Sequence, residues 1–436
     1  MLTSHVWPLT AECIDNQLAI GGCRVAELGA KYGTPLYIFD EETLREACRA
    51  YRNAFEPYPG TVHFSYASKA LLNLAVAHIL IEEGFGFDVV SLGEMKLALH
   101  AGARPNAIHL HGNAKPRFEL EEAIKTGIGL IAVDNLDEAS TLAALCAELE
   151  IEQKIILRIE PAVAAETHKK IQTGQKGSKF GLALTEIDGL VSVIQASPYL
   201  KLVGLHFHLG SQLFDMQAYQ KAIRVVLDLM VTLQDRYGIA ITQVSPGGGL
   251  AAAYRAEEEP PNPADLAGHL IDFMVDGCRE RRLALPTLIL EPGRSISARA
   301  GVALYEVIGS KPIETAANGA TRYVHVDGGM GDNLRPALYS ARYTAVVANR
   351  VVADEQETVH ISGRFCESGD LLAKDIVLPK AEMEDLIAFA TAGAYTLSMA
   401  NNYNLVPRPA VVMIKDGSPR LIQRRETFID LIQRDV

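Results

Sequence analysis

Short apolar runs alternate with longer amphipathic segments between residues 61 and 294. The runs are rich in Val, Ile and Phe and are typical of buried strands: VHFSYASK, FGFDVVS, AIHLHGN, GLIAVDN, KIILRIE, LVGLHFHLGS, ITQVSPGGG and TLILEPGR. Between them, apolar positions recur every three or four residues, as in FELEEAIKTG and MQAYQKAIRVVLDLMVTLQDRYG, which predicts helices. Eight such strand–helix repeats predict an α/β fold built on a (β/α)8 TIM-type barrel.

The pattern changes on both sides of this region. After residue 295, short strand-like runs are separated by Gly and Pro, as in VALYEVIGSK, RYVHVDGGM, TAVVANR and PAVVMIKDG. The N-terminal run QLAIGGCRVAEL has a similar character. We therefore predict two domains: a barrel over residues 35–294, and a mostly antiparallel β domain made from residues 1–34 and 295–436.

Composition narrows the classes of function. The 436 residues are 48% hydrophobic, enough for two ordinary cores, and the net charge of 41 − 53 = −12 disfavours nucleic acid or an anionic membrane as the main partner. The six cysteines show no spacing typical of a zinc site or a disulfide framework, so we expect no metal and a reducing compartment. The N-terminus lacks a signal-peptide pattern, and no apolar stretch is long enough to span a membrane, which favours the cytoplasm.

Polar and glycine residues gather where the predicted strands end. In a barrel of this type, these C-terminal ends face one mouth, so the residues there indicate chemistry. They are Lys69, Asp88, His111, Asn113, Asn135, Arg158, His208, Ser211, Gly247–Gly249, Glu291 and Arg294. Taken singly, a strand-end lysine is most often a solvated cap and a glycine triplet most often a turn. Their occurrence on successive strands is better explained by a shared binding site.

Two of these features together indicate a cofactor. The glycines of SPGGGL leave backbone N–H groups open to phosphate oxygens, and Ser211 and Arg294 would add donors. Lys69 in a largely dry barrel mouth would lose its proton more easily than in water, and its free amine would attack an aldehyde. An aldehyde and a phosphate in one molecule indicate pyridoxal 5'-phosphate. Glu291 would keep the ring nitrogen protonated, and His208 would stack on the ring.

Seven ordered motifs carry a resemblance to a known family. They are YASKA, HFHLGSQ, SPGGGL, EPGRSI, RPALY, CESGD and GAYTLSMANNYN, and the segment THKKIQTGQKGSKFGL (167–182) also fits. In this order they are similar to the fold-type III pyridoxal-phosphate decarboxylases, and among these to the diaminopimelate decarboxylases. The resemblance covers nearly the whole chain, from TPLYIFDEETLR (34–45) to the NYN motif near residue 404. It implies the barrel and β-domain architecture of alanine racemase and ornithine decarboxylase.

The resemblance implies a role at the cofactor for each matched residue. Lys69 corresponds to the lysine that forms a Schiff base, His208 to the histidine that stacks on the ring, and Glu291 to the partner of the pyridine nitrogen. Asp88 and Arg158 would lie near the Schiff base in supporting roles. The remaining cofactor-binding positions, chiefly for the phosphate, are Ser211, Gly248, Gly249, Gly293, Arg294 and Tyr395.

The resemblance also implies a substrate, meso-2,6-diaminopimelate, whose decarboxylation to L-lysine and CO2 is the last step of lysine biosynthesis. Cys366 corresponds to the family's proton donor and Glu367 to a substrate-contacting carboxylate. Arg335 and Tyr339 match residues that grip the distal carboxylate, assisted by Arg294 and Tyr395. One guanidinium and one carboxylate suit a distal end that carries both signs. Family members form homodimers, and the Cys366–Glu367 loop would enter the partner's site.

Other functions stay open at this point. A related decarboxylase of ornithine, lysine, arginine or carboxynorspermidine, or of D-lysine or D-ornithine, would use the same chemistry with another reader of the distal end. An alanine-type racemase is disfavoured, because it places an arginine beside the ring nitrogen where this chain has Glu291. A non-catalytic homologue that binds the cofactor would be expected to lack Lys69 or Cys366, and both are present.

Overall fold

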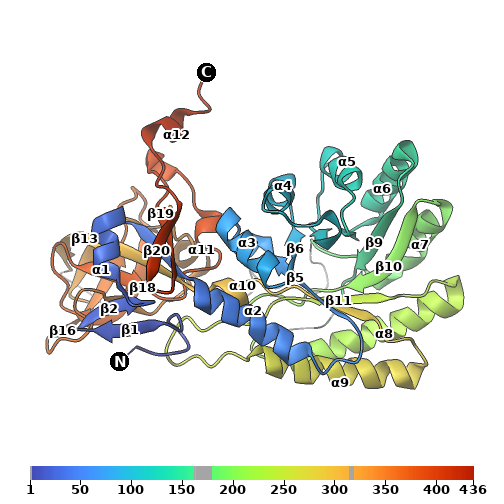
Figure 1. The fold of residues 1–436 in the computed structure, drawn as a ribbon, viewed down its shortest axis with the longest axis horizontal. Helices are drawn as coiled ribbons and strands as arrows, with labels where there is room; N and C mark the ends of the chain where they lie inside the picture. The colour runs from blue at the N-terminus through green and yellow to red at the C-terminus, as the bar shows by residue number, and fades with distance from the viewer. Residues whose placement is uncertain (1, 162, 164–178, 314–318) are drawn as a thin grey trace. The chain divides into compact units, whose positions relative to one another are not determined.

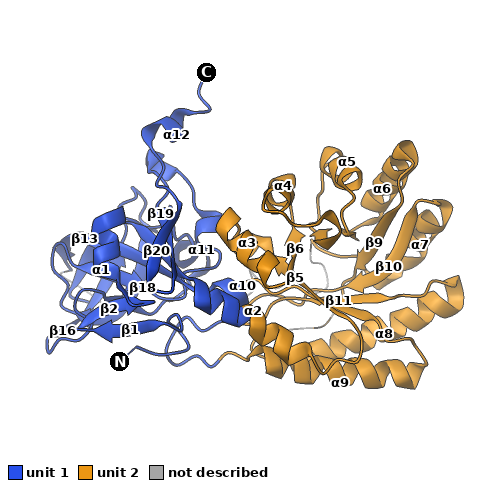
Figure 2. Cartoon of the chain, in the orientation of Figure 1, with its two compact units in different colours: residues 1–47, 252–259, 294–436 blue, residues 48–251, 260–293 orange. Residues whose placement is uncertain are grey.

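The computed structural model describes residues 2–161, 163, 179–313 and 319–436. Most of the segment THKKIQTGQKGSKFGL, residues 167–178, therefore lies outside the described residues. The chain divides into two compact units (Figure 2). Residues 48–251 and 260–293 form the barrel unit, and residues 1–47, 252–259 and 294–436 form the β unit.

The barrel unit is built on parallel strands that close on themselves (Figure 1). Among the described residues, eight strands follow one another in chain order, and β12 closes the ring by pairing with β5, Leu288 opposite Val62. The strands are β5 (Val62–Ala67), β6 (Gly86–Val89), β7 (Ile108–Leu110), β8 (Leu130–Val133), β9 (Gln153–Arg158), β10 (Leu200–His206), β11 (Gln243–Gly247) and β12 (Thr287–Leu290). The predicted barrel is confirmed, strand by strand.

Several helices of the barrel unit begin at a residue whose side chain caps the helix. The side chains of Asn73, Ser91 and Asn135 each accept a hydrogen bond from a backbone N–H in the first helical turn, which stabilises the helix start. The helices are α3 (Leu74–Glu82), α4 (Leu92–His100), α5 (Arg117–Thr126), α6 (Leu136–Leu149), α7 (Ile187–Ala196), α8 (Gln217–Tyr237) and α9 (Pro263–Arg281). Within the described ranges, no helix combines the length and apolar character needed to cross a membrane.

The β unit contains, in its described part, a three-stranded and a nine-stranded sheet. The small sheet comprises β1 (Ala11–Ile14), β2 (Gln17–Ile20) and β3 (Cys23–Arg24). The large sheet comprises β4 (Leu36–Asp40), β13 (Gly301–Pro312), β14 (Arg322–Val326), β15 (Ala345–Val347), β16 (Gln356–Ser362), β17 (Leu371–Pro379), β18 (Leu386–Phe389), β19 (Ala410–Lys415) and β20 (Ser418–Gln423). Most pairings are antiparallel, and β4–β19 and β14–β16 are parallel. The predicted mostly antiparallel β domain is confirmed.

Four short helices belong to the β unit, and one helix crosses the boundary between the units. The short helices are α1 (Val25–Tyr32), α10 (Arg294–Ser297), α11 (Arg335–Tyr339) and α12 (Phe428–Ile432) in the described chain. Helix α2 (Glu41–Phe55) begins in the β unit and ends in the barrel unit.

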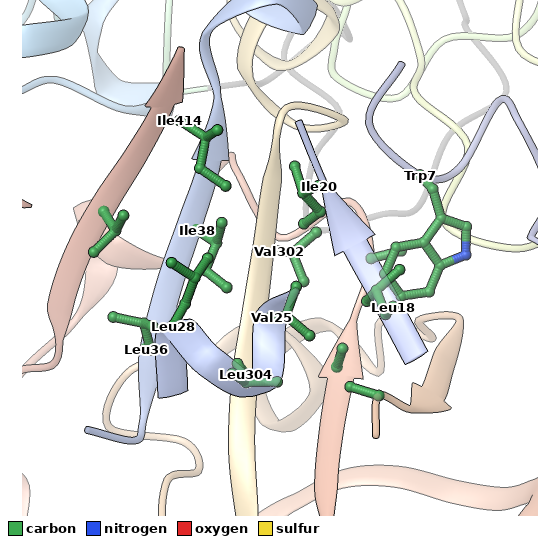
Figure 3. Packing of buried hydrophobic residues seen from close by; sticks show 14 of the residues in the cluster. Trp7, Leu18, Ile20, Val25, Leu28, Leu36, Ile38, Val302, Leu304 and Ile414 are labelled. Atoms are coloured by element: carbon green, nitrogen blue, oxygen red, sulfur yellow. The ribbon is translucent and has the colours of Figure 1, made fainter. Parts of the chain in front are cut away.

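Strand β4 lies at the centre of the large sheet. It pairs antiparallel with β13, Leu36 opposite Leu304, and parallel with β19, Leu36 opposite Ala410. Its apolar side chains pack with those of the neighbouring strands and of β2 in one buried cluster, shown in Figure 3. The predicted boundary after residue 34 differs from this division, because all five β4 residues are buried in the β unit. A continuous apolar run fits a central strand of either domain equally well.

Candidate active site

Buried polar side chains meet at the C-terminal end of the barrel strands. Asp88 lies on β6, Arg158 on β9, His206 on β10 and Ser245 on β11, and Glu291 follows β12; all five are buried. Parallel strands that close into a barrel end at one rim, so residues far apart in sequence are brought together there. Burying this much charge is costly unless the groups pair with one another or with a ligand.

Glu291 is the centre of this group. The Ser245 hydroxyl donates a hydrogen bond to Glu291 Oε1 at 2.6 Å, and His206 Nε2 lies 3.1 Å from Oε2. His111 Nε2 lies 3.6 Å from Oε1. Burial alone would raise the pKa of Glu291, but the adjacent histidines and the hydrogen bonds from His206 and Ser245 outweigh it and hold the pKa well below its usual range. Glu291 is therefore ionised at neutral pH.

Burial favours the uncharged form of three groups near Glu291. Burial, followed by the negative charge of Glu291, raises the pKa of Asp88 to about 8, so this acid is mostly protonated at neutral pH. Burial also holds the pKa of the His111 imidazole and of the His208 imidazole well below the usual range. The charge of Lys69 adds to the effect at His208. Asp88, His111 and His208 are therefore mostly uncharged at neutral pH, in contrast to Glu291.

Lys69 lies in a short 3-10 turn, Ser68–Ala70, directly after β5. Its side chain is exposed in this chain, whereas Ser68 and Ala70 on either side are buried. The expected dry environment is therefore wrong for the chain taken alone, because the turn carries Lys69 beyond the buried part of the strand. Its positive charge still acts on Asp88 and His208, which places the amine within electrostatic range of the buried groups.

The glycine turn after β11 presents only backbone. Gly247 and Gly249 have φ of 72° and 114°, a region that favours glycine. A Cβ on Gly248 would lie 2.0 Å from the carbonyl oxygen of Glu291, and one on Gly247 would lie 2.8 Å from His208 Nδ1. The turn therefore packs against the ends of the neighbouring strands with no room for side chains, as a cradle for phosphate oxygens requires.

The β unit contributes a cluster of arginine and tyrosine side chains. Arg294 Nη1 donates to the Tyr254 hydroxyl at 2.5 Å, and its guanidinium lies 4.6 Å from the centre of the Tyr395 ring. Arg335 Nη1 donates to the Tyr343 hydroxyl at 2.8 Å, and its guanidinium lies 4.4 Å from the centre of the Tyr254 ring. Tyr254 therefore contacts both arginines.

Arg335 is buried, and it forms no ion pair with a carboxylate among the described residues. Burial alone would lower its pKa, but the oxygens of Tyr254 and Tyr343 outweigh it, so the pKa is raised and the guanidinium is charged. A buried cation held by phenols and aromatic rings is suited to bind an anion.

Cys366 and Glu367 lie on an exposed turn between β16 and β17. The turn is fixed through its backbone: the Cys366 N–H donates to Asn404 Oδ1 at 3.0 Å, and the Tyr403 hydroxyl donates to the Cys366 carbonyl at 3.4 Å. The Phe365 ring stacks on Tyr403 with 6.2 Å between ring centres. Both side chains therefore project from a braced backbone.

The structure gives several predicted residues other neighbours than expected. Asn135 is the N-cap of α6. Arg158 has its Nε 3.8 Å from Asp134 Oδ1, and its guanidinium lies 4.4 Å from the centre of the Phe180 ring. The hydroxyl bound by Arg335 belongs to Tyr343, whereas Tyr339 lies half-buried at the end of α11.

Sequence reasoning missed His206, Ser245, Tyr254 and Tyr343. The spacing in HFH was a usable signal, because alternate residues of a strand point to the same face. No comparable signal marks the two tyrosines, whose contacts join segments far apart in the sequence. Among the described residues, His111, His206 and Glu291 could together hold a metal ion, a set that spacing along the chain does not show.

Comparisons with known proteins identify the family of this chain. The profile of the family described as "Pyridoxal-dependent decarboxylase, pyridoxal binding domain" matches residues 41–298. The diaminopimelate decarboxylase of Bacillus methanolicus is 40% identical over 413 residues, which cover 94% of this chain and 95% of the relative. The Synechocystis enzyme of the same name is 41% identical over 441 residues, which cover 99% of this chain and 93% of the relative.

A solved structure gives the same result. The crystal structure of diaminopimelate decarboxylase from M. jannaschii matches with a TM-score of 0.91 at 36% identity and covers 98% of both chains. A second structure of that enzyme, in co-complex with L-lysine, matches equally well. With the family profile spanning more than half of the chain, these likenesses show that the chain belongs to the diaminopimelate decarboxylases within the pyridoxal-dependent decarboxylase family.

Proposed function

We propose that this chain decarboxylates meso-2,6-diaminopimelate to L-lysine and CO2 with pyridoxal phosphate as cofactor, the last step of lysine biosynthesis. The main observation behind the proposal is that the guanidinium of Arg335 is buried and held by tyrosines. The barrel of the same chain carries Lys69, an ionised Glu291 and the Gly247–Gly249 turn. A distal carboxylate on the substrate would supply the anion that this guanidinium suits. The names of the relatives support the same substrate.

The residues predicted to bind the cofactor fit pyridoxal phosphate. Lys69 would attach the aldehyde covalently, Glu291 would bind the ring nitrogen, and His208, packed against the glycine turn, would cover a ring face. The phosphate would be bound by Ser211, Gly248, Gly249, Arg294 and Tyr395, with Gly293 close by in sequence. When bound, this cofactor supplies a sink for the electron pair that remains on the α-carbon as CO2 leaves.

The protein's own groups then control where protons lie. Ionised Glu291 would hold a proton on the ring nitrogen, and His206 and Ser245 would keep Glu291 ionised. Asp88 and Arg158 would support the covalent linkage from nearby. Cys366 would donate the proton that the α-carbon needs after CO2 has left, a form of general acid catalysis.

Ser245→Ala tests whether the hydrogen bond from Ser245 keeps Glu291 ionised. Loss of the hydroxyl that donates to Glu291 Oε1 should raise the pKa of this carboxylate and lower kcat about tenfold. Since activity needs ionised Glu291, the acid limb of the kcat–pH profile should move to higher pH. Ser65→Ala is the matched control, because Ser65 is a buried barrel serine whose hydroxyl has no hydrogen-bond partner among the described residues. An unshifted acid limb in Ser245→Ala would contradict the assignment.

The distal end of the substrate would be bound by one positive and one negative side chain. Arg335 would bind the distal carboxylate, with Tyr339, Arg294 and Tyr395 assisting, and Glu367 would bind the distal ammonium. Tyr254 and Tyr343 hold the two arginines in place and are new members of this group.

Arg335→Gln should raise KM for meso-diaminopimelate about 10–100-fold and change kcat little, because the distal contact is the same before and during the reaction. Steady-state kinetics on the purified variant provide the measurement. Arg322→Gln is a suitable control, since Arg322 is a guanidinium of the same unit that already has a carboxylate partner in Glu357. If KM is unchanged in Arg335→Gln, another residue binds the distal carboxylate of the substrate.

A substrate panel tests the function as a whole. The purified protein with pyridoxal phosphate is incubated separately with meso-diaminopimelate, L-ornithine, L-lysine, L-arginine, D-lysine, D-ornithine and carboxynorspermidine, and CO2 is measured. We expect release from meso-diaminopimelate. Release only from an amino acid without a distal carboxylate would overturn the proposal in favour of one of its relatives.

We further propose a homodimer with shared active sites and a cytoplasmic location. The exposed Cys366 and Glu367 side chains on a braced turn support the first, because a proton donor in this position suits a site completed by a second copy. Cys13, Cys23, Cys146, Cys278 and Cys366 are free thiols, which suits a reducing compartment.

A further inference from the structure

Asp370, the last residue of CESGD, holds two distant segments with one carboxylate. It is only 3% exposed. Its Oδ2 accepts the backbone N–H of Phe365 at 2.8 Å, and its Oδ1 accepts the backbone N–H of Met330 at 2.7 Å. A buried carboxylate with two backbone donors fixes both of them, because neither donor finds water as a substitute partner.

Glycines make the room for this carboxylate. A Cβ on Gly363 would lie 2.3 Å from Asp370 Oδ2, and a Cβ on Gly329 would lie 2.5 Å from Oδ1. Gly329 also has φ of 154°, at the edge of the region that favours glycine. The Gly363 N–H in turn donates to the Asp370 carbonyl at 3.0 Å. The carboxylate therefore has one position, set by backbone on both sides.

One of the two segments leads to the proton donor. Phe365 immediately precedes Cys366, and the Asp370 N–H donates to the Glu367 carbonyl at 3.1 Å, which closes the turn. Asn404 fixes the Cys366 backbone from the other side. The orientation of the Cys366 thiol therefore depends on Asp370, which accepts the Phe365 N–H, and on Asn404, which accepts the Cys366 N–H.

The other segment, the Met330 loop, immediately precedes Arg335, the residue proposed to bind the distal carboxylate of the substrate. The backbone of the Met330 loop folds back on itself, with the Asn333 N–H donating to the Gly329 carbonyl at 2.8 Å, and Arg335 starts α11 two residues later. Asp332, the residue before Asn333, accepts the Gly329 N–H through its Oδ1 at 3.0 Å. The loop is thus tight from Gly329 to Arg335, and Asp370 bonds to its second residue.

We propose that Asp370 is a positioning residue that fixes the Cys366–Glu367 turn relative to the loop that carries Arg335. The proposal rests on the proposed function, in which Cys366 delivers the proton and Arg335 binds the distal carboxylate. If the turn serves the partner's site, Asp370 aligns Cys366, the proton donor of one active site, with Arg335, which binds substrate in the other active site. Loss of Asp370 would then disturb kcat and KM together, although Asp370 touches no substrate.

Asp370→Asn is the test, because it keeps the shape but places an amide NH2 against one of the two N–H donors. We expect kcat at least about tenfold lower and KM at least about threefold higher. Hydrogen exchange of the amides of Met330 and Phe365 should be at least about tenfold faster, with and without cofactor. More pyridoxamine phosphate should form per CO2, because a proton that does not reach the α-carbon would be delivered to the cofactor, and water would then release the amino group on the cofactor and the substrate's α-carbon as an aldehyde.

Asp385→Asn is the matched control. Asp385 is another buried carboxylate of the β unit, which accepts hydrogen bonds from Asn349, Arg350 and the backbone N–H of Glu382. Its loss should leave the pyridoxamine phosphate ratio and the exchange of the two amides unchanged. If Asp370→Asn fails to fold, Gly363→Ala keeps the carboxylate but crowds Oδ2, and it should accelerate exchange at Phe365 and raise the ratio.

The outcomes separate this inference from the proposed function. Equal behaviour of Asp370→Asn and Asp385→Asn in exchange and in product ratio would overturn the positioning role. If Cys366→Ala itself leaves turnover unchanged, the proposed proton donor is wrong instead. Slow turnover in Cys366→Ala together with a raised ratio and fast Phe365 exchange in Asp370→Asn is the result that supports both.

Discussion

The variant Lys69→Ala is expected to bind pyridoxal phosphate without a covalent bond and to release CO2 from meso-diaminopimelate at least about 10⁴-fold more slowly than the parent chain. The reason is that no other group replaces a primary amine as the point of attachment to the aldehyde. Borohydride reduction followed by mass spectrometry checks the bond: the peptide that contains residue 69 should gain the cofactor's mass in the parent chain and not in the variant.

Two lysines make the test sharper. Lys69→Arg keeps a positive charge but offers no nucleophilic amine, so it should fail as completely as Lys69→Ala. Lys115, also in the barrel unit, should never be labelled, because its Nζ donates to the carbonyls of Gly112 and Ala132 and to Glu138 Oε1 at 2.6–2.7 Å. Reduced cofactor found on Lys115 rather than on Lys69 would contradict the assignment.

Cys366→Ala should lower kcat about 10²–10⁴-fold, the usual contribution of a general acid, while the cofactor stays bound and KM changes little. In the proposed reaction the thiol would act after CO2 has left, so its loss would slow protonation of the α-carbon without weakening substrate binding. Cys13→Ala is the matched control, because Cys13 is the other exposed cysteine of the chain. Unchanged turnover in Cys366→Ala would remove the thiol from the mechanism.

Mixing the two inactive variants tests whether sites are shared between chains. In a dimer of Lys69→Ala with Cys366→Ala, one of the two sites would combine an intact Lys69 with an intact Cys366 from the other chain. With random exchange of subunits, activity should recover to about a quarter of the parent level. No recovery after verified exchange would place both residues in the site of a single chain.

The barrel could be predicted from sequence because its strands are buried on both faces and read as continuous apolar runs. The same property hid the role of β4, whose run of Leu36–Asp40 looks like another barrel strand although it pairs with β13 and β19. Pairing partners far apart along the chain leave no mark in local periodicity.

The sequence predicted those candidate site residues that lie at the C-terminal ends of the barrel strands. Asp88, Arg158 and Glu291 stand there in buried positions, as the closed barrel requires. The exposure of Lys69 could not be predicted, because it depends on how far one turn extends past the strand. The hydroxyls of Ser245 and Tyr343 were missed, since a polar contact between strands or loops depends on register and rotamer rather than on residue type.

The central place of β4 has a consequence for synthesis of the protein. The ribosome releases β4 before any barrel strand, but its two partners emerge much later: β13 follows the complete barrel, and β19 is among the last strands made. The barrel can close on its own strands while β4 still has two open edges, which are prone to pair with other chains. We therefore expect the edges of β4 to stay open to pairing with other chains until β19 has been translated.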